Sequence, residues 1–202
     1  MLKALARSLE DAWFDATRSV STSRAVEIGG LRLAGPRRDG FMYLPSRARN
    51  ARALLRALPL GDPARYAFVD LGSGAGRVLF IAAEFPFQWV VGVELSAELH
   101  QLAEENIRRF HWRRKRCPNI VSINASAADY QFPNENLVIF LFNPFGPSIL
   151  RDVLKNLNDS LQRNRRSVFL AVLYPEYKEV IDQSAAQLKL IESTPRHAIY
   201  TT

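Results

Sequence analysis

Three glycines and two carboxylates are spaced so that together they could hold a ligand that carries a ribose. Gly72, Gly74 and Gly76 lie within five residues and directly follow an apolar segment that contains Asp70. Glycines in such a turn accept left-handed backbone angles and let a ligand approach the main chain closely. Glu94 ends a second apolar segment about 20 residues beyond the glycines, where a Rossmann-type unit places the acid that binds ribose hydroxyls. The spacing therefore predicts a strand, a glycine turn, a helix, a second strand and a ribose-binding acid.

The details of this turn argue against a dinucleotide. A dinucleotide fingerprint has the spacing G-x-G-x-x-G, which presents helix amides to a pyrophosphate. In this chain the third glycine comes one residue early, and Arg77 stands where that glycine is expected. The Asp70 carboxylate would repel a pyrophosphate but suits a ligand with an ammonium group. A turn that binds no ligand is the plainer alternative.

The pattern D-x-G-x-G-x-G resembles motif I of the class I S-adenosylmethionine-dependent methyltransferases, and Val93-Glu94-Leu95 resembles their acidic ribose motif. The resemblance implies that the three glycines line the methionine part of the cofactor. It also implies that Asp70 orders the amino end and that Glu94, with Leu95 beside it, binds the ribose. Many relatives carry Gly-Asp-Ala near the adenine, and this chain departs from that pattern with Ala125-Ser126-Ala127. We expect the Ser126 hydroxyl and the Ala127 amide to contact the adenine, while Asp129 either replaces the missing carboxylate or caps a turn.

A second resemblance lies upstream, in Tyr43-Leu44-Pro45-Ser46. It is similar to the Tyr-x-Pro-Ser/Thr element that covers the cofactor pocket in one set of small class I methyltransferases. The resemblance places Tyr43 and Ser46 near the methionine carboxylate. A hydroxyl beside free helix amides could bind that group. Ser46 as a simple N-cap of the following helix is the alternative.

The resemblance also implies that the residues after the apolar segment 137–142, Asn143, Pro144 and Phe145, face the transferred methyl, and that Asn143 contacts the cofactor as well. Asn143-Pro144-Phe145 is similar to the Asp/Asn-Pro-Pro-Tyr/Phe motif of enzymes that methylate amines or amides, although only one proline is present. The resemblance implies that the Asn side-chain oxygen and a proline carbonyl accept hydrogen bonds from the target nitrogen, while the aromatic ring packs on a planar target. Catalysis of this kind works by positioning. An Asn-Pro turn without such a role is the alternative.

Strand-like and helix-like segments alternate along the chain, which predicts a doubly wound α/β sheet. The family resemblance implies seven strands, mainly parallel, in the order 3-2-1-4-5-7-6. We expect the methyltransferase domain to span 39–202. Residues 1–38 form an N-terminal extension, whose first 25 residues are predicted to hold one amphipathic helix packed on the domain. Its apolar stripe is Leu2, Leu5, Leu9 and Trp13.

Composition limits the partners. The 202 residues suit one domain with a sizeable core, and the single cysteine, Cys117, excludes an internal disulfide and a cysteine-based zinc site. With only three scattered histidines, we expect no metal. No apolar run reaches the ~20 residues that span a bilayer, and no signal sequence is recognisable, so we expect a cytoplasmic protein without a membrane partner.

The net charge of +7 favours an acidic partner, and its densest cluster is 108–116. Arginines interleaved with Phe110, His111 and Trp112 could contact phosphates and stack on bases. The alternative is that these cations simply favour a helix C-terminus and solvate the loop after it. The segment from Arg108 to Arg116 is thus a candidate nucleic-acid contact.

Taken together, these observations predict an S-adenosylmethionine-dependent methyltransferase that transfers a methyl group to nitrogen. The glycine turn and the general layout look like those of small protein-lysine methyltransferases, including the telomeric-silencing histone enzymes. A protein side chain is therefore the first expected acceptor. An RNA or DNA amine is the alternative, and so is a non-catalytic accessory protein that binds the cofactor or RNA.

Overall fold

The computed structural model describes residues 2–23 and 44–202, with side chains from residue 9 onward in the first of these ranges. The predicted domain boundary after residue 38 and the predicted contact at Tyr43 lie outside the described residues. The helices are α1 (Leu2–Arg18), α2 (Ala48–Ala57), α3 (Arg77–Ala82), α4 (Ala97–Arg109), α5 (Pro147–Arg163) and α6 (Lys178–Ser184), with 3-10 turns η2 (Pro63–Arg65) and η3 (Ala127–Asp129).

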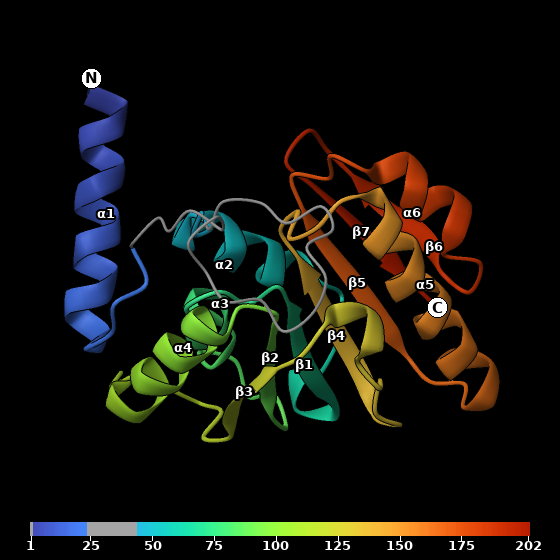
Figure 1. Cartoon of the computed structure of the whole chain (residues 1–202), viewed down its shortest axis with the longest axis horizontal. Coiled ribbons are helices and arrows are strands. Elements are labelled where there is room, and N and C mark those ends of the chain that lie inside the picture. The colour runs from blue at the N-terminus through green and yellow to red at the C-terminus, as the bar shows by residue number, and fades with distance from the viewer. Residues whose placement is uncertain (1, 24–43) are drawn as a thin grey trace.

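The strands form one seven-stranded sheet in the order β3-β2-β1-β4-β5-β7-β6, as expected (Figure 1). The first five strands run parallel, and β7 is antiparallel to both of its neighbours. Because all five parallel strands point the same way, their carboxyl ends share one edge of the sheet, which is where open α/β sheets bind ligands. The strands are β1 (Tyr66–Leu71), β2 (Val90–Glu94), β3 (Ile120–Asn124), β4 (Asn136–Leu141), β5 (Val168–Leu173), β6 (Lys189–Ser193) and β7 (His197–Thr201).

The central strands are apolar throughout because helices cover both of their faces. All six residues of β1 and all six of β5 are buried. Side chains of one face, such as Phe68 and Phe140, pack with α2 and α3, whereas those of the other face, such as Val69 and Ile139, pack with α5. The packed core therefore holds β1 and β4 rigidly at the centre of the sheet. The turns that follow these two strands are held in place because each begins at a fixed strand end.

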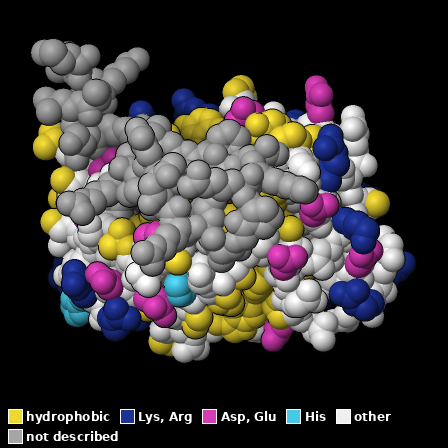
Figure 2. All heavy atoms as spheres, viewed as in Figure 1, with side chains coloured by type: hydrophobic (Ala, Val, Ile, Leu, Met, Phe, Trp, Pro, Cys, Tyr) yellow, Lys and Arg dark blue, Asp and Glu magenta, His cyan; other side chains and the backbone are white. Residues whose placement is uncertain are grey.

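One face of the sheet is less completely covered near β3. The connection from β3 to β4 carries only the 3-10 turn η3 where a covering helix would otherwise lie, so Val121 and Ile123 remain 50% and 36% exposed. Figure 2 shows hydrophobic side chains gathered at the lower centre of the molecule, over the region where Figure 1 places β1 to β3.

The N-terminal helix docks through a different face from the one predicted. Leu9 and Trp13, two members of the expected apolar stripe, are 64% and 61% exposed, whereas Phe14 is buried. The helix also ends at Arg18, several residues before the predicted end. The helix itself and its packing on the domain are confirmed, but Leu9 and Trp13 do not form the docking face, because α1 is held there by the buried Phe14 and by ion pairs of Asp11 and Arg18. In the view of Figure 1, α1 stands along one side of the sheet and its helices.

In the described part of the chain, no helix is both long and apolar enough to cross a membrane.

Candidate functional site

The glycine turn between β1 and α3 is closed against the end of β2. Gly72, Gly74 and Gly76 all have positive φ angles, of 79°, 55° and 89°. The amides of Gly72 and Ser73 both donate to the Val93 carbonyl, at 2.8 and 3.1 Å. The turn therefore lies at the carboxyl edge of the sheet, directly beside the end of β2, as the sequence predicted.

The Glu94 carboxylate is fixed by this turn. One of its oxygens accepts from the Gly74 amide at 2.7 Å, and the other accepts from the Ser96 amide at 2.8 Å. The side chain is buried, and burial raises its pKa although these backbone hydrogen bonds act in the opposite direction. Each carboxylate oxygen keeps a second lone pair, so the group can still accept from two neighbouring hydroxyls. Leu95 follows directly, and its carbonyl accepts from the Asn124 side chain at 3.1 Å.

Asp70 is the most unusual titratable group of the site. Its side chain is 3% exposed and makes no hydrogen bond to any residue that the structure describes. Burial raises the pKa of Asp70 well above its ordinary value, and the nearby charge of Glu94 raises it further. A buried carboxylate without a cationic partner is costly, so a ligand that brings a positive charge would stabilise it. The pair of acids beside a glycine turn fits a ligand with an ammonium group and ribose hydroxyls, as S-adenosylmethionine has.

The Asn-Pro-Phe segment meets the glycine turn directly. A Cβ atom built on Gly72 would lie only 2.1 Å from the Pro144 Cβ. Only a glycine therefore permits the two loops to approach so closely. This contact brings the predicted cofactor turn, after β1, together with the predicted acceptor loop, after the adjacent strand β4.

Asn143 is held in a strained position by the loop after β5. Its φ angle is 43°, and that of Tyr174 is 51°, both unusual for residues other than glycine. The Asn143 Nδ2 donates to the Tyr174 carbonyl at 2.6 Å, and its Oδ1 lies 3.4 Å from the Glu176 amide. This arrangement fixes which end of the Asn143 amide is the oxygen and leaves that oxygen able to accept a further hydrogen bond. Strain of this kind gathers at functional sites.

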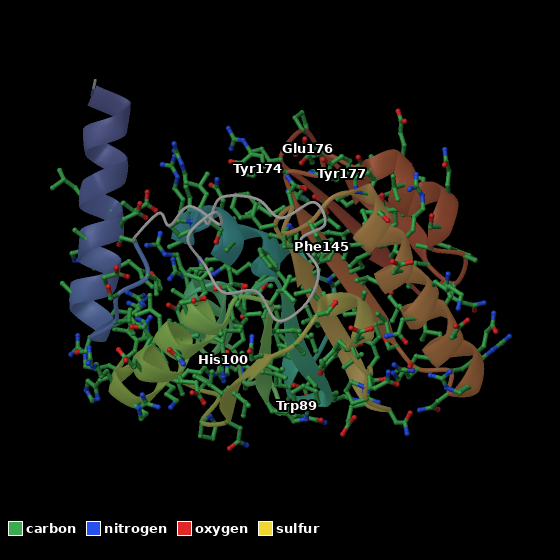
Figure 3. The ribbon with its side chains drawn as sticks, viewed as in Figure 1. Trp89, His100, Phe145, Tyr174, Glu176 and Tyr177 are labelled. Atoms are coloured by element: carbon green, nitrogen blue, oxygen red, sulfur yellow. The ribbon has the colours of Figure 1, made fainter. Side chains whose placement is uncertain are left out.

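The sequence reasoning missed the role of Tyr174. Its hydroxyl accepts from the Asn50 side chain on α2 at 2.6 Å, so the residue joins the ends of β4 and β5 to α2. The available signal was a Tyr-Pro pair directly after the apolar segment 168–173, at the same edge as the other site residues. In Figure 3, Tyr174, Glu176 and Tyr177 gather at one end of the sheet with Phe145 below them, and Trp89 lies at the opposite end.

The Phe145 ring is buried, 7% exposed, where the resemblance implied an aromatic surface for a planar target. It lines a small cavity beneath the Asn-Pro segment, and this cavity continues into the core between β4, β5, α5 and α6. As the structure stands, Phe145 supports the acceptor loop from below. The other residues of the cavity wall are Leu141, Asn143, Pro144, Leu150, Val172, Tyr177 and Ile181.

Ser46 does not cap α2 as the sequence suggested. The N-cap residue is Arg47, which makes no side-chain cap. The Ser46 Oγ is buried and has no hydrogen-bond partner among the described residues. A buried hydroxyl without a partner is destabilising, so this atom is available to a ligand.

The predicted adenine contacts have a partly structural role. The Ser126 Oγ accepts from the Ala128 amide at 3.3 Å, which makes Ser126 the cap of η3. Ala127, the next residue, is buried against the core. Both lie just beyond β3 and so at the same edge of the sheet as Glu94.

The basic segment lies away from this edge. The amides of Arg116 and Cys117 donate to the Ala83 carbonyl, which follows the last residue of α3. Since α3 starts at the glycine turn, its end lies toward the amino ends of the strands. Arg113 to Arg116 are exposed there. Among the described residues, no cluster of side chains could hold a metal ion.

Comparison with known proteins identifies the family. The model of the family "Histone methylation protein DOT1" matches residues 59–185, which is more than half of the chain. The chain belongs to the DOT1 family. The matched range contains the glycine turn, both buried acids and Asn143. Class I S-adenosylmethionine-dependent methyltransferases include this family, so the chain is an enzyme of that class and S-adenosylmethionine is its cofactor. A comparison with curated proteins finds no match.

Solved structures share the fold of this DOT1-family chain at low sequence identity. A predicted N6-adenine-specific DNA methylase from Listeria monocytogenes superposes with a TM-score of 0.57 at 16% identity, over 78% of this chain and 51% of that one. A ribosomal protein L11 methylase from Lactobacillus delbrueckii gives 0.50 at 17% identity, over 76% of each chain. A putative O-methyltransferase from Nostoc punctiforme gives 0.55 at 14% identity, over 76% of this chain and 55% of that one. The chain thus spans about half the length of the Listeria and Nostoc proteins, and the three proteins are described with different acceptors.

Proposed function

We propose that this enzyme transfers a methyl group from S-adenosylmethionine to an amine nitrogen of a protein side chain, with lysine as the first choice. The observation that carries the proposal is the contact between Gly72 and Pro144, because it sets the strained Asn143 beside the cofactor turn. An acceptor held by Asn143 would then lie next to the methionine end of the cofactor.

The cofactor roles follow from the chemistry of each group. Asp70 would pair with the cofactor ammonium, which relieves the cost of its buried charge. Glu94, already aligned by Gly74 and Ser96, would accept from the two ribose hydroxyls. The unpartnered Ser46 hydroxyl would donate to the methionine carboxylate. Ser126, Ala127 and Leu95 would border the adenine, whereas Gly72 and Gly74 would let the cofactor approach the main chain.

Asn143 would act on the acceptor by positioning. When bound, S-adenosylmethionine supplies a methyl group made electrophilic by its sulfonium. The acceptor nitrogen needs a free lone pair, so a lysine must arrive as the neutral amine. The Asn143 Oδ1, oriented by the hydrogen bond from Nδ2 to the Tyr174 carbonyl, would accept one N–H bond of that amine and aim its lone pair at the methyl. Alignment of this kind supplies a large part of the rate of a direct transfer.

The preference for a protein acceptor rests on the family. The family description names histone methylation, and one structural neighbour is described as a methylase of a ribosomal protein. Both descriptions concern protein substrates. Lysine is the acceptor whose slender, flexible side chain could reach a nitrogen-binding group set beside the cofactor turn.

A nucleic-acid amine is the second candidate, and the exposed arginines of the segment 108–116 favour it. The Listeria neighbour is described as an adenine-specific DNA methylase. The segment nevertheless lies toward the amino ends of the strands, at the opposite edge from Asn143. A nucleic acid bound there would have to extend around the sheet to reach the methyl group.

The test is transfer of a labelled methyl group into separated protein and RNA fractions, with three variants. At saturating S-adenosylmethionine, Asn143→Ala should transfer about 100-fold more slowly, since misplacement of the acceptor by about 1 Å has that effect. Asn136→Ala is the matched control, because Asn136 also ties two backbone segments together but lies at the start of β4. It should leave transfer unchanged.

The acceptor class is decided by the third variant, in which Arg113, Arg114 and Arg116 are reversed to glutamate. Label in protein that survives this reversal supports the protein acceptor. Label that appears in RNA alone and disappears on reversal would establish the second candidate and refute the first.

A further inference from the structure

Arg77, which replaces the glycine of a dinucleotide fingerprint, is a buried charge at the start of α3. Its guanidinium is 2% exposed, although it directly follows the glycine turn. It forms an ion pair with Asp11 of α1, and its Nε donates to the Thr22 Oγ1 at 2.8 Å. The side chain therefore points into the N-terminal extension.

The same guanidinium reaches two further segments. Its Nη2 donates to the Ser23 Oγ at 3.2 Å, and its Nη1 donates to the Ser46 carbonyl at 3.3 Å, just before α2. Asp15 lies 3.9 Å from it and also binds the amides of Thr22 and Ser23, at 2.8 and 2.9 Å. One buried cation thus joins α1, residues 22–23 and the start of α2 to the first residue after the glycine turn.

Ser46 links this network to the proposed cofactor site. Its carbonyl accepts from Arg77, the residue is 4% exposed, and its side-chain hydroxyl is buried and unpartnered among the described residues. A hydroxyl in this state is a ready partner for a ligand. The position of that hydroxyl depends on where Arg77 holds the backbone of Ser46.

We propose that Arg77 is a positioning residue for cofactor binding, because it fixes the backbone of Ser46 relative to the glycine turn. The N-terminal extension supplies the carboxylates of Asp11 and Asp15, which neutralise the charge of Arg77. This role rests on the proposed cofactor assignment of Ser46. The extension is accordingly a structural part of the cofactor site, and its helix α1 is not an independent module for binding a partner.

The chain contains a matched second anchor of the same helix. Arg18, at the end of α1, is 1% exposed and pairs with Glu84 at 2.9 Å, and Glu84 also binds Arg52 of α2 at 2.8 Å. This anchor lies beyond the far end of α3, away from the glycine turn. Both anchors hold α1, but among the described contacts only Arg77 binds Ser46.

The test compares Arg77→Lys and Asp11→Asn with Glu84→Gln. For each full-length variant, S-adenosylmethionine affinity is measured by calorimetry and the free energy of unfolding by urea titration. Arg77→Lys keeps the positive charge but loses the planar guanidinium whose nitrogens reach three segments. Asp11→Asn is the milder change, because it removes only one negative charge beside Arg77. Both should raise the Kd about tenfold or more, because they weaken hydrogen bonds to a charged group. Glu84→Gln should lower the stability but change the Kd less than about twofold.

A double variant checks the route through Ser46. If Arg77 acts through that residue, Arg77→Lys should weaken binding much less in a Ser46→Ala background than in the wild type, since coupled sites are non-additive. Additive losses, an unchanged Kd in Arg77→Lys, or an equal loss in Glu84→Gln would overturn the proposal. A wild type that binds no S-adenosylmethionine would instead refute the cofactor assignment itself, and this role with it.

Discussion

Replacing Gly72 by alanine tests whether the cofactor turn and the acceptor loop are physically joined. The new Cβ would lie 2.1 Å from the Pro144 Cβ and 3.1 Å from its Cγ. Carbon atoms make favourable contact at about 3.5–4.0 Å, so one loop must move by more than 1 Å. The backbone angle of Gly72, φ 79°, adds a second penalty, since alanine is strained in the left-handed region.

The chain offers a control in which these two penalties separate. Gly61 has a similar φ of 65°, but a Cβ there would meet no atom within 4 Å. Gly61→Ala should therefore lower the free energy of unfolding by the backbone penalty alone, about 1–2 kcal/mol. Gly72→Ala should add the steric penalty, about 1–3 kcal/mol more.

Urea unfolding of both variants measures this difference, and labelled-methyl transfer measures its consequence. At a temperature where both variants stay folded, Gly61→Ala should retain normal transfer. Gly72→Ala should lose about 100-fold, because the acceptor loop is displaced by about 1 Å or more. Equal destabilisation by the two substitutions, or normal transfer by Gly72→Ala, would show that the cofactor turn and the acceptor loop are not physically joined.

Three further predictions concern charge. Asp70→Asn should stabilise the ligand-free protein at neutral pH, which thermal melting can check. Because the pKa of Asp70 is raised in the folded protein, its contribution to folding stability is fully present below pH 3.8 and is lost as the pH rises through the folded pKa. The same variant should weaken S-adenosylmethionine binding about ten- to 150-fold by calorimetry, and wild-type affinity should fall as the pH is lowered and Asp70 takes up a proton. Burial alone would raise the pKa of Glu84, but the hydrogen bonds and charges of Arg52 and Arg18 outweigh burial and lower it. Glu84 therefore stabilises the folded protein fully above pH 4.5, and this stabilisation is lost as the pH falls through the lowered folded pKa. Glu84→Gln should therefore flatten the acid limb of the urea-unfolding pH profile, and an unchanged limb would contradict this assignment.

The parts of the fold that could be predicted are those that depend on local pattern. The fully apolar segment 137–142 predicts a central strand with coverage on both faces, and the glycines before Arg77 predict a sharp turn into a helix. The separation of this turn from Glu94 follows from the length of one strand-helix-strand unit. The strand order, in contrast, came only from the family resemblance, because the sequence does not show which strands are neighbours.

The errors and omissions concern contacts between distant segments. The periodicity of Leu9 and Trp13 predicted the wrong docking face for α1, since the helix is held by Asp11 and Phe14 against residues more than 60 positions away. Likewise, the Tyr-Pro pair at Tyr174 indicates only that a strand ends there, and the hydrogen bond from the Asn143 amide to the Tyr174 carbonyl depends on the packing of two distant loops. For Ser46, the sequence left a cofactor contact and a helix cap both open, because serine before a helix is usually a cap, and the helix cap is the interpretation that was wrong. Its hydroxyl is instead left without a partner among the described residues.

The cofactor site is best tested by calorimetric titration of S-adenosylmethionine into the wild type and Glu94→Ala, with folding of both checked by circular dichroism. We expect micromolar binding by the wild type, and loss of that binding in a folded Glu94→Ala protein, because the ribose and the Gly74 amide lose their common acceptor. An absence of binding by the folded wild type, or equal binding by both proteins, would contradict the cofactor site described for this enzyme.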